Sequence, residues 1–349
     1  MLSASAPGKL VLLGEYAVLE GAPALVQAID RRAVVSVVER AAERASFHAI
    51  PLLPQAIEFE WTADGGVRFT DEDAGRSLTH AARLLAAFGP WTENGSPVAI
   101  SADTRRFFAA AGYKLGIGSS AALSVALAAA WFACRHPGSP FDPGRWLGVL
   151  RELHRSAQGG QGSGIDLAAS LYGGVIRYNL VEESPQINRL SLPAALSWVW
   201  IGLGRAASTG DFLRAARRLK ESDCAVYDNH IRHLGEIAAT GCAAAEENDA
   251  AGLLAALQAY GGALERFGLA AEAPIYTADH RRLAQIAGRY PVAFKPSGAG
   301  GGDIALAAAA DPEALAAFAR DVHGAGYPLL PLAPAADGVT VALAVNEPT

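Results

Sequence analysis

The sequence predicts an α+β protein, and three kinds of pattern point to this fold class. Runs rich in β-branched residues at 9–13 and 33–39 are typical of strands. The segment 59–70 has two short runs around an Asp-Gly-Gly turn, which predicts a β-hairpin. Apolar, periodic segments predict helices at 77–88, 119–133 and 143–156. Because strands, hairpins and helices are mixed along the chain, α+β is favoured over a doubly wound parallel sheet.

The second half of the chain continues this mixture. Strands are predicted at 174–180 and 196–203, and helices at 211–240, 242–248, 250–267 and 281–288. The end of the chain predicts one more strand, helix and strand. The polar, Pro-containing stretch 182–193 is the best candidate for a domain boundary. At 349 residues the chain exceeds one typical core, so we expect an N-terminal domain at 1–187 and a C-terminal domain at 188–349.

Composition narrows the class of protein. A net charge of −6 argues against a general nucleic-acid binder, which needs a basic excess to neutralise phosphates. The longest apolar stretch, about thirteen residues at 121–133, is shorter than the roughly twenty that span a bilayer. Three separated cysteines without CxxC spacing predict reduced thiols. With no basic region before the N-terminal apolar run, we expect a soluble, cytoplasmic protein that binds neither nucleic acid nor membrane.

A glycine-rich turn leads directly into one of the apolar predicted helices. Gly116 and Gly118 allow close approach to a ligand, and Ser119 and Ser120 are placed to cap a helix whose free N–H groups favour an anion. This is not a Walker A loop, because its lysine, Lys114, precedes the glycines. A Rossmann turn is disfavoured because no good strand precedes it and the expected acidic residue is missing. Taken alone, the pattern fits a capped helix as well as a phosphate-binding loop.

Two further glycine-rich stretches favour phosphate. They read APGKLVLLGEYAVLEGAPAL at 6–25 and KPSGAGGGDIAL at 295–306. Four glycines in five positions after the serine of the second stretch are hard to explain by folding, since glycine costs conformational order. The chain has four lysines among 29 basic residues, and Lys9, Lys114 and Lys295 lie in the glycine-rich stretches. A lysine ammonium is a compact point charge suited to phosphate, so the phosphate-binding interpretation is favoured.

In this order and at these separations, the three stretches resemble the three motifs of the GHMP kinases. This family includes galactokinase, homoserine kinase, mevalonate kinase and phosphomevalonate kinase. The resemblance runs from residue 6 to about residue 306. It implies the GHMP kinase fold, with an N-terminal domain like ribosomal protein S5 domain 2 and a ferredoxin-like C-terminal domain. It also implies ATP and Mg²⁺ as cofactors, with ATP in the cleft, and a small-molecule acceptor.

The stretch 154–174 discriminates between acceptors. Its pieces AQG (157–159) and GSGID (162–166), with KPSGAGGGD, look like phosphomevalonate kinases. Mevalonate kinases carry a magnesium-binding glutamate eleven residues before the aspartate, where this chain has Arg155, and GEHAVV where it has GEYAVL. A phosphate acceptor is largely ionised at neutral pH, so the main barrier to the reaction is repulsion between the acceptor and the phosphates of ATP. Lysines and a metal ion reduce this repulsion. The resemblance implies phosphomevalonate as acceptor, with mevalonate as the alternative.

The resemblance also implies roles for single residues. Lys9 stabilises the transferring group or attacking oxygen, and Asp166 acts as base or orienting group. From the residues alone, Lys9 is also compatible with a surface turn and Asp166 with a helix N-cap. Ser120 is the expected Mg²⁺ ligand. The expected cofactor-binding residues are Lys114, Gly116, Gly118, Ser119, Ser120 and Ala121. The expected substrate-binding residues are Lys9, Glu15, Tyr16, Ser208, Lys295, Ser297, Gly298 and Gly300.

The sequence is also compatible with other functions. A nucleotide-binding regulator with the fold but without catalysis is a rival from a different class. The simultaneous presence of Lys9, Ser120 and Asp166 argues against it. Homoserine and sugar kinases are more distant enzyme alternatives, and both a monomer and a homodimer are compatible with the sequence.

Overall fold

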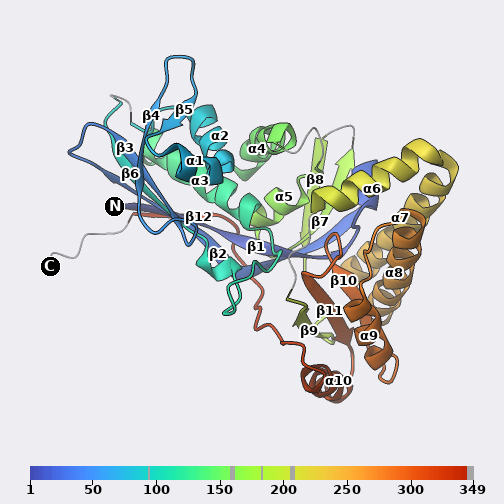
Figure 1. Ribbon diagram of the computed structural model, residues 1–349. Helices are drawn as coiled ribbons and strands as arrows, with labels where there is room; N and C mark the ends of the chain where they lie inside the picture. The colour runs from blue at the N-terminus through green and yellow to red at the C-terminus, as the bar shows by residue number, and fades with distance from the viewer. Residues whose placement is uncertain (93–94, 158–161, 182–183, 205–208, 344–349) are drawn as a thin grey trace.

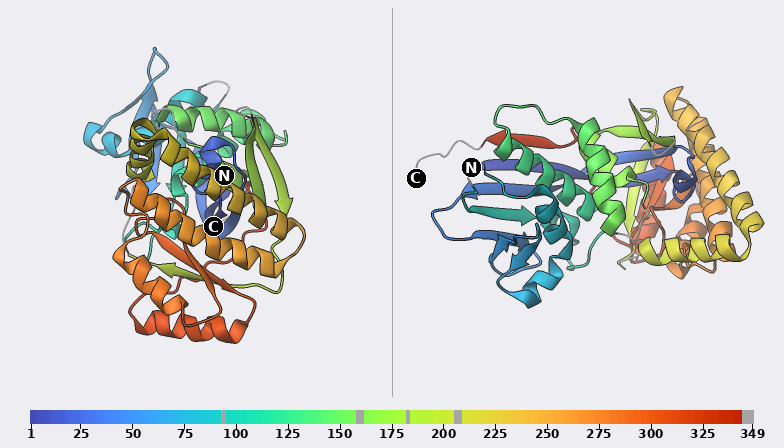
Figure 2. Two further views of the ribbon diagram at one scale, coloured as in Figure 1. Left: turned by 90° about the vertical axis from the view of Figure 1, so that its right-hand side faces the viewer. Right: turned by 90° about the horizontal axis from the view of Figure 1, so that it is seen from above.

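The computed structural model describes residues 1–92, 95–157, 162–181, 184–204 and 209–343. These residues form two sheets, one of nine strands and one of three, with helices packed on both (Figure 1). The predicted α+β class is confirmed. The N-terminus and β12 (Thr340–Leu343) lie at one end of the molecule, and the helices α7 (Cys224–Glu246) and α8 (Ala250–Ala270) lie at the other (Figures 1 and 2).

The larger sheet is built mainly from the N-terminal half of the chain. Its main path runs β12-β1-β2-β6-β3-β4-β5, and β7 pairs with β2 and β8. The strands are β1 (Leu2–Leu13), β2 (Ala24–Glu39), β3 (Ala45–Ile50), β4 (Ile57–Trp61), β5 (Val67–Phe69), β6 (Val98–Asp103), β7 (Val175–Val181), β8 (Ser184–Leu190) and β12 (Thr340–Leu343). The predicted hairpin is confirmed, because Trp61 of β4 pairs with Val67 of β5 across the Asp-Gly-Gly turn.

Helix α3 (Ser119–Arg135) packs on β1 and β2 of this sheet. It is rich in alanine, whose small side chain brings the helix close to the strands, and all residues from Ala121 to Ala130 except Leu123 are buried. This fixes the start of α3 near the middle of β1. The other helices of this part are α1 (Glu72–Ser77), α2 (Thr79–Phe88), α4 (Pro143–Ala157) and α5 (Ile165–Tyr172), with short 3₁₀ turns η1 (Ala17–Glu20) and η2 (Arg105–Phe107).

The smaller sheet belongs to the C-terminal half, with strand order β10-β11-β9. Its strands are β9 (Ser197–Gly202), β10 (Ala293–Ser297) and β11 (Ile304–Ala309). Besides α7 and α8, the helices of this half are α6 (Thr209–Ser222), α9 (Ala278–Ala287) and α10 (Pro312–Gly324). In the described part of the chain, no helix combines the length and apolarity that crossing a bilayer requires.

Strand β8 lies where the sequence suggested a domain boundary. The division expected between residues 187 and 188 falls inside this strand, and β12 near the C-terminus returns to the larger sheet. Within the described residues β8 pairs with β7 alone, so it is an edge strand, and an edge strand tolerates Pro185. Its residues alternate between half-buried and exposed, and its polar composition resembles that of a linker. Most of the stretch 182–193, the candidate domain boundary, thus forms strand β8.

The helix predicted at 211–240 is also corrected, because it is interrupted. Asp223 caps α7 by accepting a hydrogen bond from the Val226 N–H at 3.0 Å, which ends α6 and starts a new helix. Helix α7 then continues to Glu246, through most of the segment predicted as a separate helix at 242–248.

A seam joins the two halves along β1 and the loop after β10. The Ser297 hydroxyl donates to the Val11 carbonyl at 3.0 Å and accepts from the Val11 N–H at 3.1 Å. The Tyr16 hydroxyl donates to the Ala299 carbonyl at 2.5 Å. The first and third glycine-rich stretches, almost 300 residues apart in sequence, are thus in direct contact.

Candidate active site

Lys9 lies on β1 at the point where the three glycine-rich stretches meet. Its backbone N–H donates to the Ile117 carbonyl at 2.9 Å, just before α3. A Cβ atom added at Gly118 would lie 3.1 Å from Lys9 Cγ, and one added at Gly298 would lie 3.9 Å from Lys9 Nζ. The lysine side chain therefore runs along the second stretch, and its ammonium group lies beside the third.

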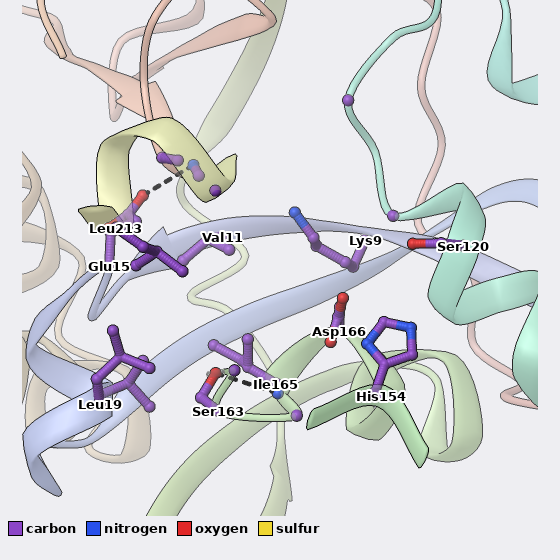
Figure 3. A pocket seen from close by; sticks show the side chains of 18 of the residues that line it. Lys9, Val11, Glu15, Leu19, Ser120, His154, Ser163, Ile165, Asp166 and Leu213 are labelled. Carbon is purple, nitrogen blue, oxygen red and sulfur yellow. Dashed lines mark hydrogen bonds between the residues drawn. The ribbon is translucent and has the colours of Figure 1, made fainter. Parts of the chain in front are cut away.

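A cavity of about 810 Å³ surrounds the Lys9 side chain (Figure 3). This volume is typical of sites for small molecules. Among the described residues, the charged or titratable side chains on its wall are Lys9, Lys114, Arg151, His154, Arg155, Arg214, Arg217, Glu15, Asp166 and Asp303. Six lysines and arginines thus share the wall with three carboxylates. The excess of positive charge suits anionic ligands.

The phosphate-loop helix α3 begins at Ser119, with Gly118 as its N-cap residue. Gly118 has a φ angle of 83°, a left-handed conformation that glycine adopts without strain. Among the described residues no side chain caps this helix, so the expected serine cap is wrong. Since the glycine occupies the cap position, both serines fall in the first helical turn instead. The helix N–H groups at the cavity wall are therefore available to an anion.

A network of uncharged side chains holds the first turn of α3. The Ser124 hydroxyl donates to the Ser120 carbonyl at 2.8 Å, and His80 Nε2 lies 2.8 Å from the same hydroxyl. The ring of His80 also packs edge-on against His154, with centroids 5.4 Å apart. Burial lowers the pKa of His80 to about 4, and the nearby His154 adds to this shift. His80 is therefore neutral at pH 7 and positions Ser120 without adding charge.

Asp166 lies in the first turn of α5, which begins at Ile165 with Gly164 as its N-cap. Asp166 Oδ1 accepts a hydrogen bond from the Leu167 N–H at 3.0 Å. Asp166 is therefore not the helix N-cap, the alternative that the sequence left open. The partial positive charge at the N-terminal end of α5 lies beside this carboxylate. Figure 3 shows this carboxylate directed toward the Lys9 side chain.

Lys295, the lysine of the third stretch, lies behind the cavity wall. Its Nζ atom donates to Glu15 Oε1 at 2.5 Å, and the two side chains are 0% and 4% exposed. The Gly298 N–H donates to the same carboxylate oxygen at 3.1 Å. Burial lowers the pKa of Lys295, and the Glu15 carboxylate opposes that shift. The ammonium group expected at the substrate is therefore bound to Glu15, across the seam between the two halves.

Asp303 ends the third glycine-rich stretch and contacts the second. A Cβ atom added at Gly116 would lie 2.2 Å from Asp303 Oδ2, so only glycine fits at this position. Partial desolvation lowers the pKa of Lys114, and the charge of Asp303 offsets part of this shift. Asp303 thus brings a carboxylate from the C-terminal half to the loop that precedes α3.

Known proteins of the GHMP kinase family are similar to this chain. The profile described as "GHMP kinases N terminal domain" matches residues 81–174, which include the start of α3 and Asp166. A phosphomevalonate kinase from Streptomyces sp. (strain CL190) is 29% identical over 96% of this chain and 97% of its own length. The chain is thus similar to a GHMP kinase over 96% of its length, and residues 81–174 match the N-terminal domain of that family.

Other GHMP kinases are similar over part of the chain or in fold. A mevalonate kinase from Methanothermobacter thermautotrophicus is 34% identical over 50% of this chain and 49% of its own length. The structure of Streptococcus pneumoniae phosphomevalonate kinase in complex with phosphomevalonate and AMPPNP covers 96% of this chain and 100% of its own, with a TM-score of 0.76 and 18% identity. The expected GHMP kinase fold is confirmed.

The cavity is lined by most of the residues that the sequence indicated as site candidates. These are Lys9, Glu15, Tyr16, Lys114, Gly116, Gly118, Ser119, Ser120, Asp166 and Gly298. The expected residues that are buried away from the cavity wall are Ala121, Lys295 and Gly300. The Ser297 hydroxyl is hydrogen-bonded to the backbone of Val11. Ser208 lies outside the described residues.

Sequence reasoning missed several cavity residues. Asp303 belongs to the quoted third motif, so its position was visible although no role was assigned. The α4 residues Arg151 and His154 fall in a helix whose cavity-facing side was not identified. The sequence gives no signal for Arg214. Arg217, with Arg218 and Lys220, is compatible in sequence with an exposed helix face from which one side chain reaches a phosphate. Arg214 and Arg217 both lie on the turn of α6 that faces the cavity.

The oxygen ligands in the cavity fit a Mg²⁺ ion that is carried by a nucleotide. The described residues contain no group of three or more His, Cys, Asp or Glu side chains able to hold a metal by themselves. Ser120, Asp166 and Asp303 nevertheless bring a hydroxyl and two carboxylates to one wall. Mg²⁺ in such sites takes one or two protein oxygens and completes its shell with phosphates and water. Ser120 and one of the carboxylates are sufficient for this.

Proposed function

We propose that this protein is a GHMP kinase that uses ATP and Mg²⁺ to phosphorylate (R)-5-phosphomevalonate to 5-diphosphomevalonate, a step of the mevalonate route to isoprenoids. The observation that carries the proposal is the charge of the cavity, whose wall has six lysines and arginines against three carboxylates. A nucleotide triphosphate and a phosphorylated acceptor together bring more negative charge than ATP with an acceptor that has a hydroxyl group in place of the phosphate. The 29% identity to the Streptomyces phosphomevalonate kinase extends over 96% of the chain and supports the same acceptor.

The reaction joins two anions. An oxygen of the acceptor phosphate attacks the γ-phosphorus of ATP, the bond from that phosphorus to the β-γ bridging oxygen breaks, and ADP leaves. The acceptor phosphate has a second pKa near 6, so it is largely ionised at neutral pH and needs little help from a base. The main requirement is therefore to offset charge repulsion and to align the reacting oxygens.

Lys9 and Asp166 divide these tasks in the proposed mechanism. The Lys9 ammonium lies beside Gly298 and stabilises negative charge on the transferring phosphoryl group. Asp166 is held by the Leu167 N–H, orients the ammonium and accepts a proton from the fraction of acceptor that is still protonated. The α3 N–H groups and Lys114 bind the nucleotide phosphates, and Ser120 holds Mg²⁺, which offsets the charge of the β- and γ-phosphates when bound.

Mevalonate kinase activity is the second candidate. The observation that favours it is the 34% identity to an archaeal mevalonate kinase over half of the chain. The reacting group of mevalonate is an uncharged hydroxyl, which needs a base because its proton has a very high pKa. A cavity that binds a buried phosphate would reject that analogue, because its cations would lose their counter-charge.

The test is a comparison of kcat/KM for (R)-5-phosphomevalonate and mevalonate at equal ATP and Mg²⁺. We expect a preference for the phosphorylated acceptor of at least about 10²-fold, and no turnover when Mg²⁺ is removed with EDTA. Preference for mevalonate would reject the proposal in favour of the second candidate. Tight ATP binding without turnover of either acceptor would indicate a nucleotide-binding regulator.

A further inference from the structure

One face of helix α6 closes the cavity from the C-terminal half. Gly210, Leu213, Arg214 and Arg217 all line the wall. Residues three and four positions apart lie on one face of a helix, so these four form a continuous stripe. Arg218 is exposed and is absent from the lining residues, so the two neighbouring arginines point in different directions.

The direction of this stripe is fixed by contacts one turn further along. Lys220 continues the same face, and its Nζ donates to Glu20 Oε1 at 2.6 Å. The Tyr227 hydroxyl of α7 donates to the same oxygen at 2.9 Å, and the Lys220 ammonium lies 5.1 Å from the Tyr227 ring centroid. Glu20 of η1 thus ties α6 and α7 to the N-terminal half. The cavity-facing side of α6 is therefore not free to rotate away.

The stripe lies at the end of the cavity away from the phosphate-loop helix. Figure 3 shows Leu213 and Leu19 on one side of Lys9, and Ser120 and His154 on the other. The nucleotide phosphates require the end with Ser120, where the α3 N–H groups and Lys114 are found. The acceptor must then approach Lys9 and Asp166 from the end formed by α6.

We infer that Arg214 and Arg217 bind the phosphate group that the acceptor already carries, and so select phosphorylated acceptors. This inference rests on the proposed function. The arginine guanidinium presents paired N–H donors that match two oxygens of a phosphate, and two guanidinium groups one turn apart can share one phosphate. Other cations of the wall lie at the nucleotide end. Arg214 and Arg217 are the positively charged side chains that α6 contributes to the wall.

The existing partners of the two arginines do not prevent this role. Arg214 pairs with Asp211, and Arg217 Nε lies 2.9 Å from Glu221 Oε1. The four side chains are 62–65% exposed, and ion pairs between such exposed groups contribute only about 0–1 kcal/mol. A doubly charged phosphate can therefore replace these carboxylates as the partner. The carboxylates keep the side chains extended along the helix until the acceptor binds.

The test uses Arg214→Gln, Arg217→Gln, the double variant and the control Arg218→Gln. Steady-state kinetics give KM for (R)-5-phosphomevalonate, KM for ATP and kcat for each protein. We expect KM for the acceptor to rise about tenfold in each single variant and further in the double variant, with KM for ATP within about twofold of wild type. Arg218→Gln should match wild type in all three quantities. Arg217→Lys should retain part of the acceptor affinity, because the charge remains.

The outcomes separate this inference from the proposed function. Wild-type turnover of phosphomevalonate with an unchanged acceptor KM in the double variant would overturn the inference and leave the proposed function standing. A rise in KM for ATP instead of the acceptor would also overturn it, since the arginines would then serve the nucleotide. Wild-type preference for mevalonate would reject both. Circular dichroism and melting curves check that each variant is folded.

Discussion

Lys9 and Lys295 belong to similar glycine-rich stretches, yet their surroundings are opposite. Lys9 is half-buried, faces the cavity and lies along Gly118 and Gly298. Lys295 is 0% exposed and is bound to Glu15 at 2.5 Å. The Lys9 ammonium can contact a ligand, whereas the Lys295 ammonium is already paired with the Glu15 carboxylate. The difference shows that a lysine in a glycine-rich stretch is a candidate for chemistry only when its charge is not already matched by the fold.

The buried pair acts on the chemistry through position. Glu15 accepts hydrogen bonds from both Lys295 and the Gly298 N–H, and Gly298 in turn lies beside the Lys9 ammonium. Taking two charges out of water is costly, and their attraction repays that cost only when the geometry is good. The pair therefore fixes the seam beside Lys9 and Gly298, the groups to which the proposed reaction assigns a role.

The largest expected effect comes from breaking the buried pair. Lys295→Met or Glu15→Gln alone should lower the free energy of unfolding by about 3–5 kcal/mol, since each leaves an uncompensated buried group. The double variant Glu15→Gln/Lys295→Met should lose less than the sum of the two. Urea unfolding of all three measures this. Glu246→Gln, which breaks the partly exposed pair with Arg177, is the control and should cost at most about 1 kcal/mol. Single losses of that small size would contradict a stabilising role for the buried pair.

A smaller effect, on turnover rather than stability, is expected at Asp166. Asp166→Asn keeps the hydrogen bond from Leu167 but removes the charge beside Lys9. A general base typically contributes about 10²–10⁴-fold, and an ionised acceptor places the loss near the lower end, about 10²-fold or 2.7 kcal/mol. The melting temperature should stay within about 1–2 °C of wild type. A loss above 10⁴-fold with phosphomevalonate would indicate that full base catalysis is needed.

The smallest effect concerns a third buried polar group, His280. It is 0% exposed, and burial lowers its pKa to about 4, against 6.5 when unfolded. In the unfolded chain His280 therefore binds a proton below pH 6.5, whereas in the folded chain it binds one only below about pH 4. As the pH falls below 6.5, the free energy of unfolding should therefore decrease. His280 accounts for about 2 kcal/mol of this decrease at pH 5.

His280→Gln tests this pH dependence with the local structure preserved. His280 forms a reciprocal capping box with Thr277, and glutamine at the same position supports that motif without titrating. Unfolding free energies at pH 7 and pH 5 should therefore differ less in the variant than in wild type. His323→Gln changes an exposed histidine of α10 and serves as control. An unchanged difference in His280→Gln would show that another group causes the acid sensitivity.

The fold could be predicted where local pattern and burial agree. Strand β2 contains a β-branched run and helix α3 a long apolar run, and these runs indicated the type of each element. Strand β8 escaped prediction because it is a polar edge strand that contains a proline. The break before α7 was also missed, since Asp223 lies within a long helical pattern and acts as a cap only once α6 ends.

The site could be predicted where its residues are close in sequence. The turn before α3, with Gly116, Gly118 and Ser120, is one local unit, and it indicated phosphate together with the two other glycine-rich stretches. The burial of Lys295 could not be deduced, because its partner lies 280 residues away. Arg217 carries the same charge as an exposed helix residue, and only the position of α6 over the cavity distinguishes it from Arg218.

The most direct test of this account is the comparison of Lys9→Met with Lys295→Met in one set of measurements. For each variant, kcat, the dissociation constant for ATP and the unfolding free energy are determined, and kcat is expressed per folded molecule. We expect Lys9→Met to lose turnover by about 10²-fold or more with ATP affinity and stability near wild type, since its charge matters most in the transition state. Lys295→Met should lose mainly stability. Equal losses of ATP affinity and turnover in Lys9→Met, or a larger loss of turnover per folded molecule in Lys295→Met, would contradict the account.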